Sequence, residues 1–199
     1  EEYDSLKLLP LGLNYNNVAD DSKAPYFLVH VKKKAKELIA DLKDANGEPY
    51  NLEGDGLKIY TTLNAEMQAY AEKAMKSHMS KLQNLFDRHW GKQKPWGRQT
   101  GIYENELKRS RSYKNLVKRK LSDDSLDYYL NEKHPVQLYA PQGDTVREMS
   151  IRDSVEYYVR LLNSGFFALQ PQTGEVLTWV GGLDHRFLPY DHVLAERQA

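Results

Sequence analysis

Two Asp-His pairs near the end of the chain carry groups that could bind a metal ion. Asp184-His185 and Asp191-His192 combine carboxylate and imidazole side chains, which are common zinc ligands. Their spacing matches no recognised zinc pattern, and the surrounding segment reads as a loop. Asp and His are mostly surface residues. We interpret both pairs as polar loop residues and predict no metal site.

Nucleophilic side chains also lack a supporting pattern. The chain contains no cysteine, which excludes a disulfide framework, a thiol nucleophile and a Cys-ligated zinc site. Ser150, Ser154 and Ser164 occur in neither a Ser-x-x-Lys nor a Gly-x-Ser-x-Gly context. Ser150 is better explained as a helix cap, and Asp123-Asp124 as acids in a first helical turn. We therefore predict no catalytic residue, no cofactor-binding residue and no cofactor for this chain.

Charge gives little indication of a partner. Lys plus Arg number 28 and Asp plus Glu number 28, so the net charge is zero. This balance argues against a nucleic-acid or anionic-membrane surface. The basic stretch 108–120 is interrupted by a single aromatic residue, Tyr113, and reads as a solvated helix face, with an acidic protein partner as the open alternative. Its cations are Lys108, Arg109, Arg111, Lys114, Lys118, Arg119 and Lys120.

Two tryptophans stand in a turn-rich context. Trp90 and Trp96 could stack on a sugar ring or could anchor loops to the core. The general burial of aromatic residues favours core anchoring. A sugar-binding module that uses both rings is the weaker alternative.

The first half of the chain predicts a linker, a helix, a strand and a second helix. Residues 1–24 are polar and irregular, as in an extended linker. Pro25 suits a first helical position, and Asn46-Gly47 ends that helix. Its apolar stripe is Phe27, Val31, Ala35, Leu38 and Leu42. Alternation over 57–63 predicts a half-buried strand, and Asn64 caps a helix over 65–86.

The second half predicts an α+β arrangement of helices and hairpins. Ser122 caps a short helix through Leu130, which Pro135 stops. A hairpin joins 136–140 to 145–149. Ser150 begins a helix over 151–164 with Gly165 as a left-handed C-cap. A second hairpin spans 166–180 and turns at Gln172-Thr173-Gly174. No apolar run reaches the roughly 18 residues of a membrane helix.

Four stretches resemble class A (bifunctional) penicillin-binding proteins, in the family's order. Leu169–Leu177 followed by Trp179–Gly182 resembles the start of the penicillin-binding transpeptidase domain. Arg197-Gln198-Ala199 resembles the Arg-Gln-(Pro or Ala) that precedes Gly-Ser-x-x-Lys. Ala24–Phe27 with Val31 resembles the linker after the glycosyltransferase domain. Gly56–Asn64, with Gln68 and Ala71-Glu72, resembles Gly-Leu-x-Ile-x-Thr-Thr-Leu-Asp…Gln…Ala-Glu, with Asn64 in place of the usual Asp.

The resemblance implies a non-catalytic fragment of a peptidoglycan synthase. The parent polymerises glycan strands and cross-links stem peptides through a penicillin-sensitive serine D,D-transpeptidase. The nucleophile is expected two residues past Ala199, and the glycosyltransferase carboxylates upstream of Glu1. We expect 1–86 to be the linker, 87–149 an insertion of mixed helix and hairpin, and 150–199 the truncated start of the transpeptidase domain, with an incomplete sheet.

Partners and location follow from the same resemblance. The parent is expected on the periplasmic side of the bacterial inner membrane, anchored by an N-terminal helix, with peptidoglycan precursors and stem peptides as substrates. The insertion is a candidate surface for cell-wall regulatory proteins, and the exposed sheet edge a candidate for self-association. We expect no nucleic-acid partner. The alternative is a stand-alone periplasmic protein- or peptidoglycan-interaction module built on 87–149.

Overall fold

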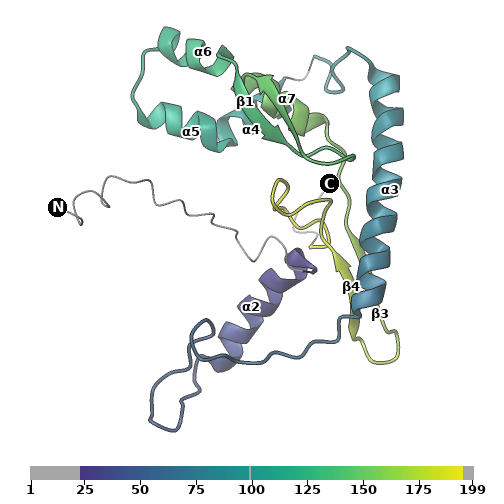
Figure 1. The fold of residues 1–199 in the computed structure, drawn as a ribbon. Helices are drawn as coiled ribbons and strands as arrows, with labels where there is room; N and C mark the ends of the chain where they lie inside the picture. The colour runs from purple at the N-terminus through teal and green to yellow at the C-terminus, as the bar shows by residue number, and fades with distance from the viewer. Residues whose placement is uncertain (1–22, 99, 195–199) are drawn as a thin grey trace, which may run out of the picture.

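The computed structural model describes residues 23–98 and 100–194 and confirms the α+β class (Figure 1). Its helices and strands follow in the order α2 (Pro25–Ile39), α3 (Ala65–Trp90), α4 (Gly101–Arg109), α5 (Arg111–Lys118), α6 (Asp123–Asn131), β1 (His134–Leu138), β2 (Thr145–Met149), α7 (Ile151–Arg160), β3 (Phe166–Leu169) and β4 (Val176–Val180). Arg197-Gln198-Ala199 and most of the predicted linker 1–24 lie outside the described residues. Within the described part, no helix is long and apolar enough to cross a bilayer.

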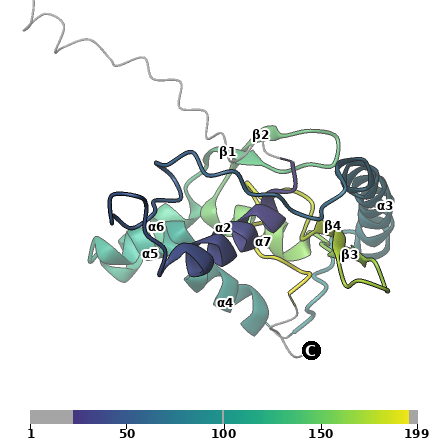
Figure 2. The same cartoon turned by 90° about the horizontal axis from the view of Figure 1, so that it is seen from below.

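Helix α3 runs along one side of the molecule and contacts both of its ends. The β3–β4 hairpin lies at the N-terminal end of α3, and the group formed by α4–α7 and β1–β2 lies toward its C-terminal end (Figure 1). Seen from below, α3 is viewed nearly along its axis with the hairpin beside it (Figure 2). The helix ends at Trp90, four residues later than the predicted 86. Asn64 caps it as predicted, accepting from the N–H groups of Glu66 and Met67.

The α4–α7 group has a core of its own. Its buried members come from α4, α5, α6 and α7, and they are Leu107, Leu116, Leu130, Ile151 and Val155. Strands β1 and β2 pair antiparallel from His134↔Met149 to Leu138↔Thr145. The predicted hairpin is confirmed, but its first strand begins at His134, so Pro135 lies inside the strand. Ser122 caps α6 as predicted, with Asp123 and Asp124 in the first turn.

Helix α7 begins as predicted and ends early. Ser150 forms a full capping box with Asp153, which confirms the predicted start. The helix stops at Arg160, not at 164, and its C-cap is Leu161, so the predicted left-handed cap at Gly165 is wrong. The N–H of Leu162 donates to the side chain of Gln83 on α3, which takes the place of the next helical bond.

The β3–β4 hairpin agrees closely with the sequence. Its strands pair from Phe166↔Val180 to Leu169↔Val176, with a bulge at Ala168/Leu169. Gly174 has φ of 75°, the positive value expected at this turn. In the described chain β3 pairs only with β4, so its outer edge is free.

Two predictions in the first half are wrong in part. Residues 57–63 are extended but form no strand, and only the end of this segment bonds to β4. The predicted apolar stripe of α2 is buried or half-buried as far as Ala35, which is 8% exposed, whereas Leu38 and Leu42 are 67% and 52% exposed. The helix itself ends at Ile39, before Asn46-Gly47. Segment 49–53 lies beside the second half of α2, but it leaves these two leucines exposed.

Thr178 supplies a stability test of the β4 packing. Its side chain is 1% exposed, and its hydroxyl is the one buried side-chain polar atom of the described residues without a hydrogen-bond partner. Leaving such a group unpaired costs about 1–3 kcal/mol, so we expect Thr178→Val to raise the free energy of unfolding by about 1 kcal/mol in urea denaturation. Exposed Thr61→Val is the matched control, with an expected change within about 0.5 kcal/mol. A destabilised T178V would contradict this assignment.

Candidate functional site

The edge of β4 that does not pair with β3 is covered by the chain that leads into α3. The hydroxyl of Thr62 donates to the carbonyl of Val176 at 2.7 Å, and the N–H of Asn64 donates to the carbonyl of Leu177 at 2.9 Å. These bonds occupy positions where a third strand would bond to β4, although the segment itself is not a strand. Asn64 therefore has two tasks, because its side chain caps α3 while its backbone pairs with β4.

Gln68 completes this edge with its side chain. Its carbonyl oxygen accepts from the N–H of Trp179 at 2.8 Å, and its amide nitrogen donates to the carbonyl of the same residue at 2.9 Å. The two bonds are those that a neighbouring strand residue would make. Gln68 is 2% exposed, so water cannot replace them. The first turn of α3 thus fixes the position of β4.

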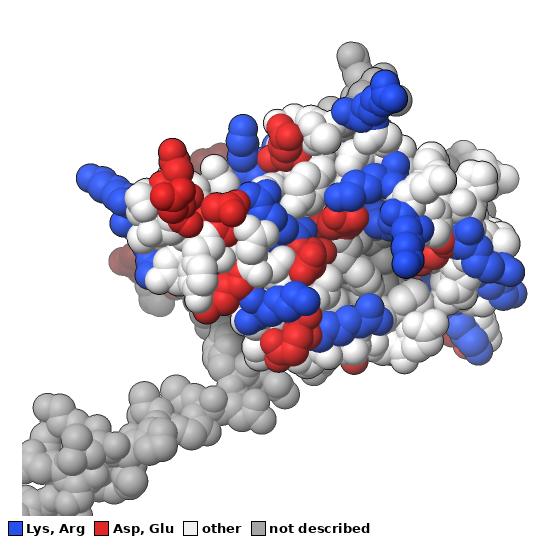
Figure 3. All heavy atoms as spheres, turned by 90° about the horizontal axis from the view of Figure 1, so that it is seen from above, with Lys and Arg blue, Asp and Glu red and all other residues white. Residues whose placement is uncertain are grey.

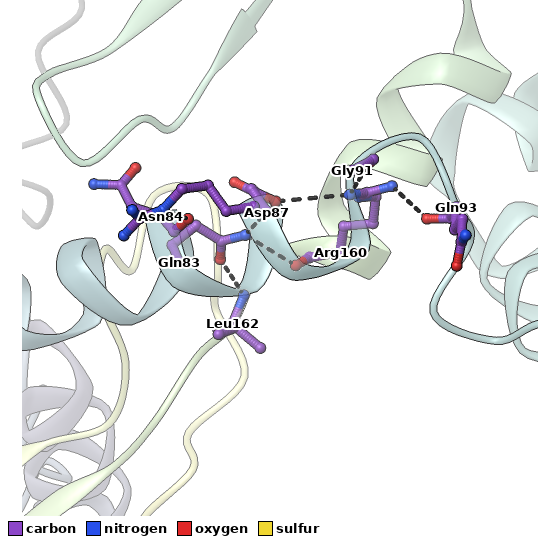
Figure 4. A network of polar contacts seen from close by, with 8 residues as sticks. Gln83, Asn84, Asp87, Gly91, Gln93, Arg160 and Leu162 are labelled. Atoms are coloured by element: carbon purple, nitrogen blue, oxygen red, sulfur yellow. Dashed lines mark hydrogen bonds and ion pairs between the residues drawn. The ribbon is translucent and has the colours of Figure 1, made fainter.

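A second glutamine repeats this contact at the other end of α3 (Figure 4). The side chain of Gln83 accepts from the N–H of Leu162 at 2.8 Å and donates to the carbonyl of Arg160 at 3.3 Å. It also donates to Asp87, one turn further along the helix, at 3.1 Å. Gln83 is 9% exposed. This amide therefore holds the end of α7 and the first extended residue that leads to β3.

Arg160 strengthens the same junction from the opposite side (Figure 4). Its guanidinium donates to the carbonyls of Gly91 and Gln93 at 3.1 Å each, just past the C-terminus of α3. A cation there also interacts favourably with the helix dipole. Asp87 lies 3.7 Å from the guanidinium. The ends of α3 and α7 are joined through these contacts.

A small apolar cluster fills the space between the two glutamines. Its buried members are Met79 of α3, Tyr139 after β1 and Leu183 after β4. Arg186 adds a polar link, because it pairs with Asp144 in the β1–β2 turn at 3.0 Å and with Asp184 at 2.7 Å. The cluster and this pair join the α4–α7 group to the loop after β4.

The predicted loop residues Asp184, His185, Asp191 and His192 are used in separate contacts. Burial alone would raise the pKa of Asp184, but hydrogen bonds and positive charge from Arg186 hold that pKa below its ordinary value. His185 packs edge-on against Tyr26, with ring centroids 4.9 Å apart. Asp191 bonds His30 and Trp179. The described residues contain no group of three or more His, Asp or Glu placed to bind a metal.

A cavity of about 380 Å³ lies between α2, α3, β4 and the loop after β4. Its acidic and basic lining consists of Glu72, Lys76, Asp184, His185 and Arg186, and Tyr26 adds a phenol. Among the described residues, no serine, threonine or cysteine lines it. Burial raises the pKa of Tyr26, whose hydroxyl donates to the carbonyl of Leu188 at 2.6 Å, so this group stays protonated. The described part of the walls therefore offers no activated nucleophile.

The serines singled out in the sequence bond to nearby backbone. Ser150 caps α7, and the hydroxyl of Ser154 donates to the carbonyl of Ile151 at 2.9 Å. The hydroxyl of Ser164 faces the carbonyl of Gly165 at 3.4 Å. None of the three hydroxyls is bonded to a base.

The basic stretch 108–120 occupies the end of α4 and helix α5. Arg109 pairs with Glu106, and Arg119 lies over the ring of Tyr129. Figure 3 shows the molecule from above, over the α4–α7 group and the C-terminal end of α3. Positive and negative side chains intermingle on this face. This distribution is typical of a solvated face.

The tryptophans of the turn-rich segment pack against neighbouring rings. Trp96 stacks on Tyr103 of α4, with ring planes 10° apart, and Trp90 lies against Phe86 on α3. Lys94 lies 5.8 Å from the Trp96 ring centroid and pairs with Glu156 of α7. These contacts agree with the core-anchor interpretation.

Sequence reasoning missed the role of Gln83. It interrupts the apolar face of α3 between Met79 and Phe86, and a polar residue at such a position is the available signal. Gln68 stands out in the sequence only as part of the family motif. Its partner, the backbone of β4, is more than a hundred positions away in the chain, so no local pattern indicates the bond.

Comparison with known proteins links the centre of the chain to one family. Residues 90–162 match the family model described as the penicillin-binding protein middle domain. The match covers less than half of the chain and ends at Leu162, whose N–H donates to Gln83. No curated protein and no solved structure matches the chain. Over this segment the chain is similar to penicillin-binding proteins, a family associated with the periplasm and the cell wall.

The two glutamines can be tested by substitution. Gln68→Met and Gln83→Met preserve side-chain length but leave one backbone N–H and one carbonyl each without a partner. At about 1–3 kcal/mol for each of the two unpaired groups, we expect either variant to lower the free energy of unfolding by about 2–6 kcal/mol in urea denaturation. Gln137→Met, at an exposed position of β1, is the control and should change it by less than about 0.5 kcal/mol. Equal effects at all three positions would refute the special role of the two amides.

Proposed function

We propose that this chain is the structural joint of a class A penicillin-binding protein. In this proposal it comprises the linker after the glycosyltransferase domain and the start of the transpeptidase domain, and carries out no chemistry itself. The observation that carries the proposal is the attachment of the family-matched segment to α3. Through Gln83, α3 binds the end of that segment, and through Gln68 it binds the hairpin that resembles the start of the transpeptidase domain.

The joint would act by positioning. The parent would polymerise glycan strands and cross-link stem peptides on the periplasmic side of the inner membrane. In the resembling family, the segment after the hairpin leads to the helix that bears the serine. A catalytic group must be placed within a fraction of an ångström of its productive position, so its support has to be rigid. Bonding of β4 on both edges supplies such rigidity here.

The experiment that tests the proposal is the sequence of the gene beyond the codon for Ala199. We expect it to continue into Gly-Ser-x-x-Lys. A stop codon directly after Ala199 would refute the proposal and favour the second candidate, a stand-alone periplasmic interaction module. That candidate is favoured by one observation, the separate core that α4–α7 form among themselves.

Penicillin labelling tests the non-catalytic part of the proposal. We expect no covalent adduct when the chain is incubated with a fluorescent penicillin, because none of its serines lies in a Ser-x-x-Lys sequence. A serine transpeptidase labelled under the same conditions is the positive control, read by gel fluorescence and intact mass. A stoichiometric adduct that survives denaturation would show an active serine within the chain and overturn this proposal.

The free edge of β3 provides a test of self-association. Phe166, Phe167 and Leu169 are 46%, 40% and 44% exposed, and an unprotected apolar edge favours pairing with another chain. We expect sedimentation velocity to show reversible association that Phe167→Lys weakens. Val146→Lys, in the other hairpin, is the control and should leave association unchanged. A strict monomer at all concentrations would contradict pairing through this edge.

A further inference from the structure

The hydrogen bonds and ring contacts that join helix α2 to β4 and to the loop after it lie in its first two turns. Tyr26 is 4% exposed, and its hydroxyl donates to the carbonyl of Leu188 at 2.6 Å. Phe27 and His30 lie against the ring of Trp179, with centroids 6.1 and 5.0 Å away. Further along, Leu38 is 67% exposed. The polar and aromatic contacts with β4 and the loop are therefore concentrated at one end of the helix.

One carboxylate connects three segments at this attachment. An oxygen of Asp191 lies 2.8 Å from Nε2 of His30 on α2 and 2.8 Å from Nε1 of Trp179 on β4. The other oxygen accepts from the N–H of Val193 at 2.9 Å. The Asp191 side chain is 13% exposed, which limits competition from water. Hydrogen bonds to a charged acceptor are stronger than neutral ones.

The backbone of the loop fits closely around these side chains. A Cβ atom on Gly181 would lie 2.5 Å from an oxygen of Asp191 and 2.7 Å from the Tyr26 ring. The N–H of His192 donates to the carbonyl of Gly181 at 2.8 Å, which closes the loop around Asp191. Loop 181–193 and the start of α2 therefore define each other's positions.

We propose that Asp191 is a latch that couples the N-terminal end of α2 to loop 181–193. Release of either one frees the other, so a displacement of the chain that enters α2 is transmitted to the chain that leaves Val193. Such coupling is reciprocal by thermodynamic necessity. The contacts of α3 with β4 involve Gln68 and not Asp191, so the latch can open while β4 stays in place. The inference does not depend on the proposed function.

The isosteric variant Asp191→Asn tests the latch directly. The asparagine side chain has one acceptor oxygen where the aspartate has two. Its NH2 group therefore faces an N–H group that donates to a carboxylate oxygen in the wild type. In NMR hydrogen exchange we expect the amides of Leu28 on α2 and of His192 in the loop to exchange about tenfold faster, in keeping with the loss of charged hydrogen bonds. Wild-type exchange at both amides would overturn the proposal.

Reciprocity is the sharper test, because it separates coupling from local damage. His30→Leu alters only α2, and we expect it to speed exchange of His192 and Val193, more than 160 positions away in the chain. Unchanged exchange at these two amides would show that α2 has no influence on the loop and would refute the latch. Glu37→Gln on α2 and Glu175→Gln in the β3–β4 turn are the controls, and both should leave these amides unaffected.

A milder variant keeps the test decisive if D191N unfolds. Trp179→Phe removes one donor to Asp191 while preserving an aromatic ring beside Phe27 and His30. We expect it to accelerate exchange at both Leu28 and His192 by a smaller factor than D191N. Acceleration at only one of the two amides would contradict coupling. The gene sequence and penicillin labelling do not bear on this outcome, so the latch and the proposed function fail independently.

Discussion

Two glutamine side chains determine how this chain is assembled. Gln68 and Gln83 lie fifteen positions apart on α3, about 22 Å along the axis and just over four turns, which places them on the same side of the helix. Each offers an amide donor and an amide acceptor to the backbone of a distant segment. Because both amides are buried, removal of either leaves unpaired backbone groups. Helix α3 thereby sets the distance between the β3–β4 hairpin and the α4–α7 group.

The same amides explain where local structure departs from local preference. The sequence after Arg160 could continue α7, but Gln83 takes the N–H of Leu162 and the carbonyl of Arg160, and the chain becomes extended. The segment before Asn64 has the alternation of a strand, yet only its end reaches β4. In both places a tertiary hydrogen bond, and not an intrinsic propensity, decides the conformation.

This contrast explains what could be predicted from the sequence. Features that depend on a few neighbouring residues were predicted correctly, such as the caps at Asn64, Ser122 and Ser150 and the turn at Gly174. The contacts of the junction depend on residues far apart in the chain. Nothing near Asp191 indicates that its carboxylate meets His30, and nothing near Arg160 indicates that it reaches the carbonyls after α3.

Trp179 is bound both by Gln68 of α3 and by Asp191 of the loop after β4. Its backbone N–H and carbonyl are bound by Gln68, while its indole nitrogen donates to Asp191. The backbone contact fixes the position of β4 relative to α3, and the indole contact relates the same strand to α2 and to the loop that follows. A strand held in this way can stay in register while the loop beyond it responds to α2. The backbone and the indole of this one residue therefore take part in different contacts: the backbone holds β4 to α3, and the indole joins β4 to the carboxylate that also binds α2.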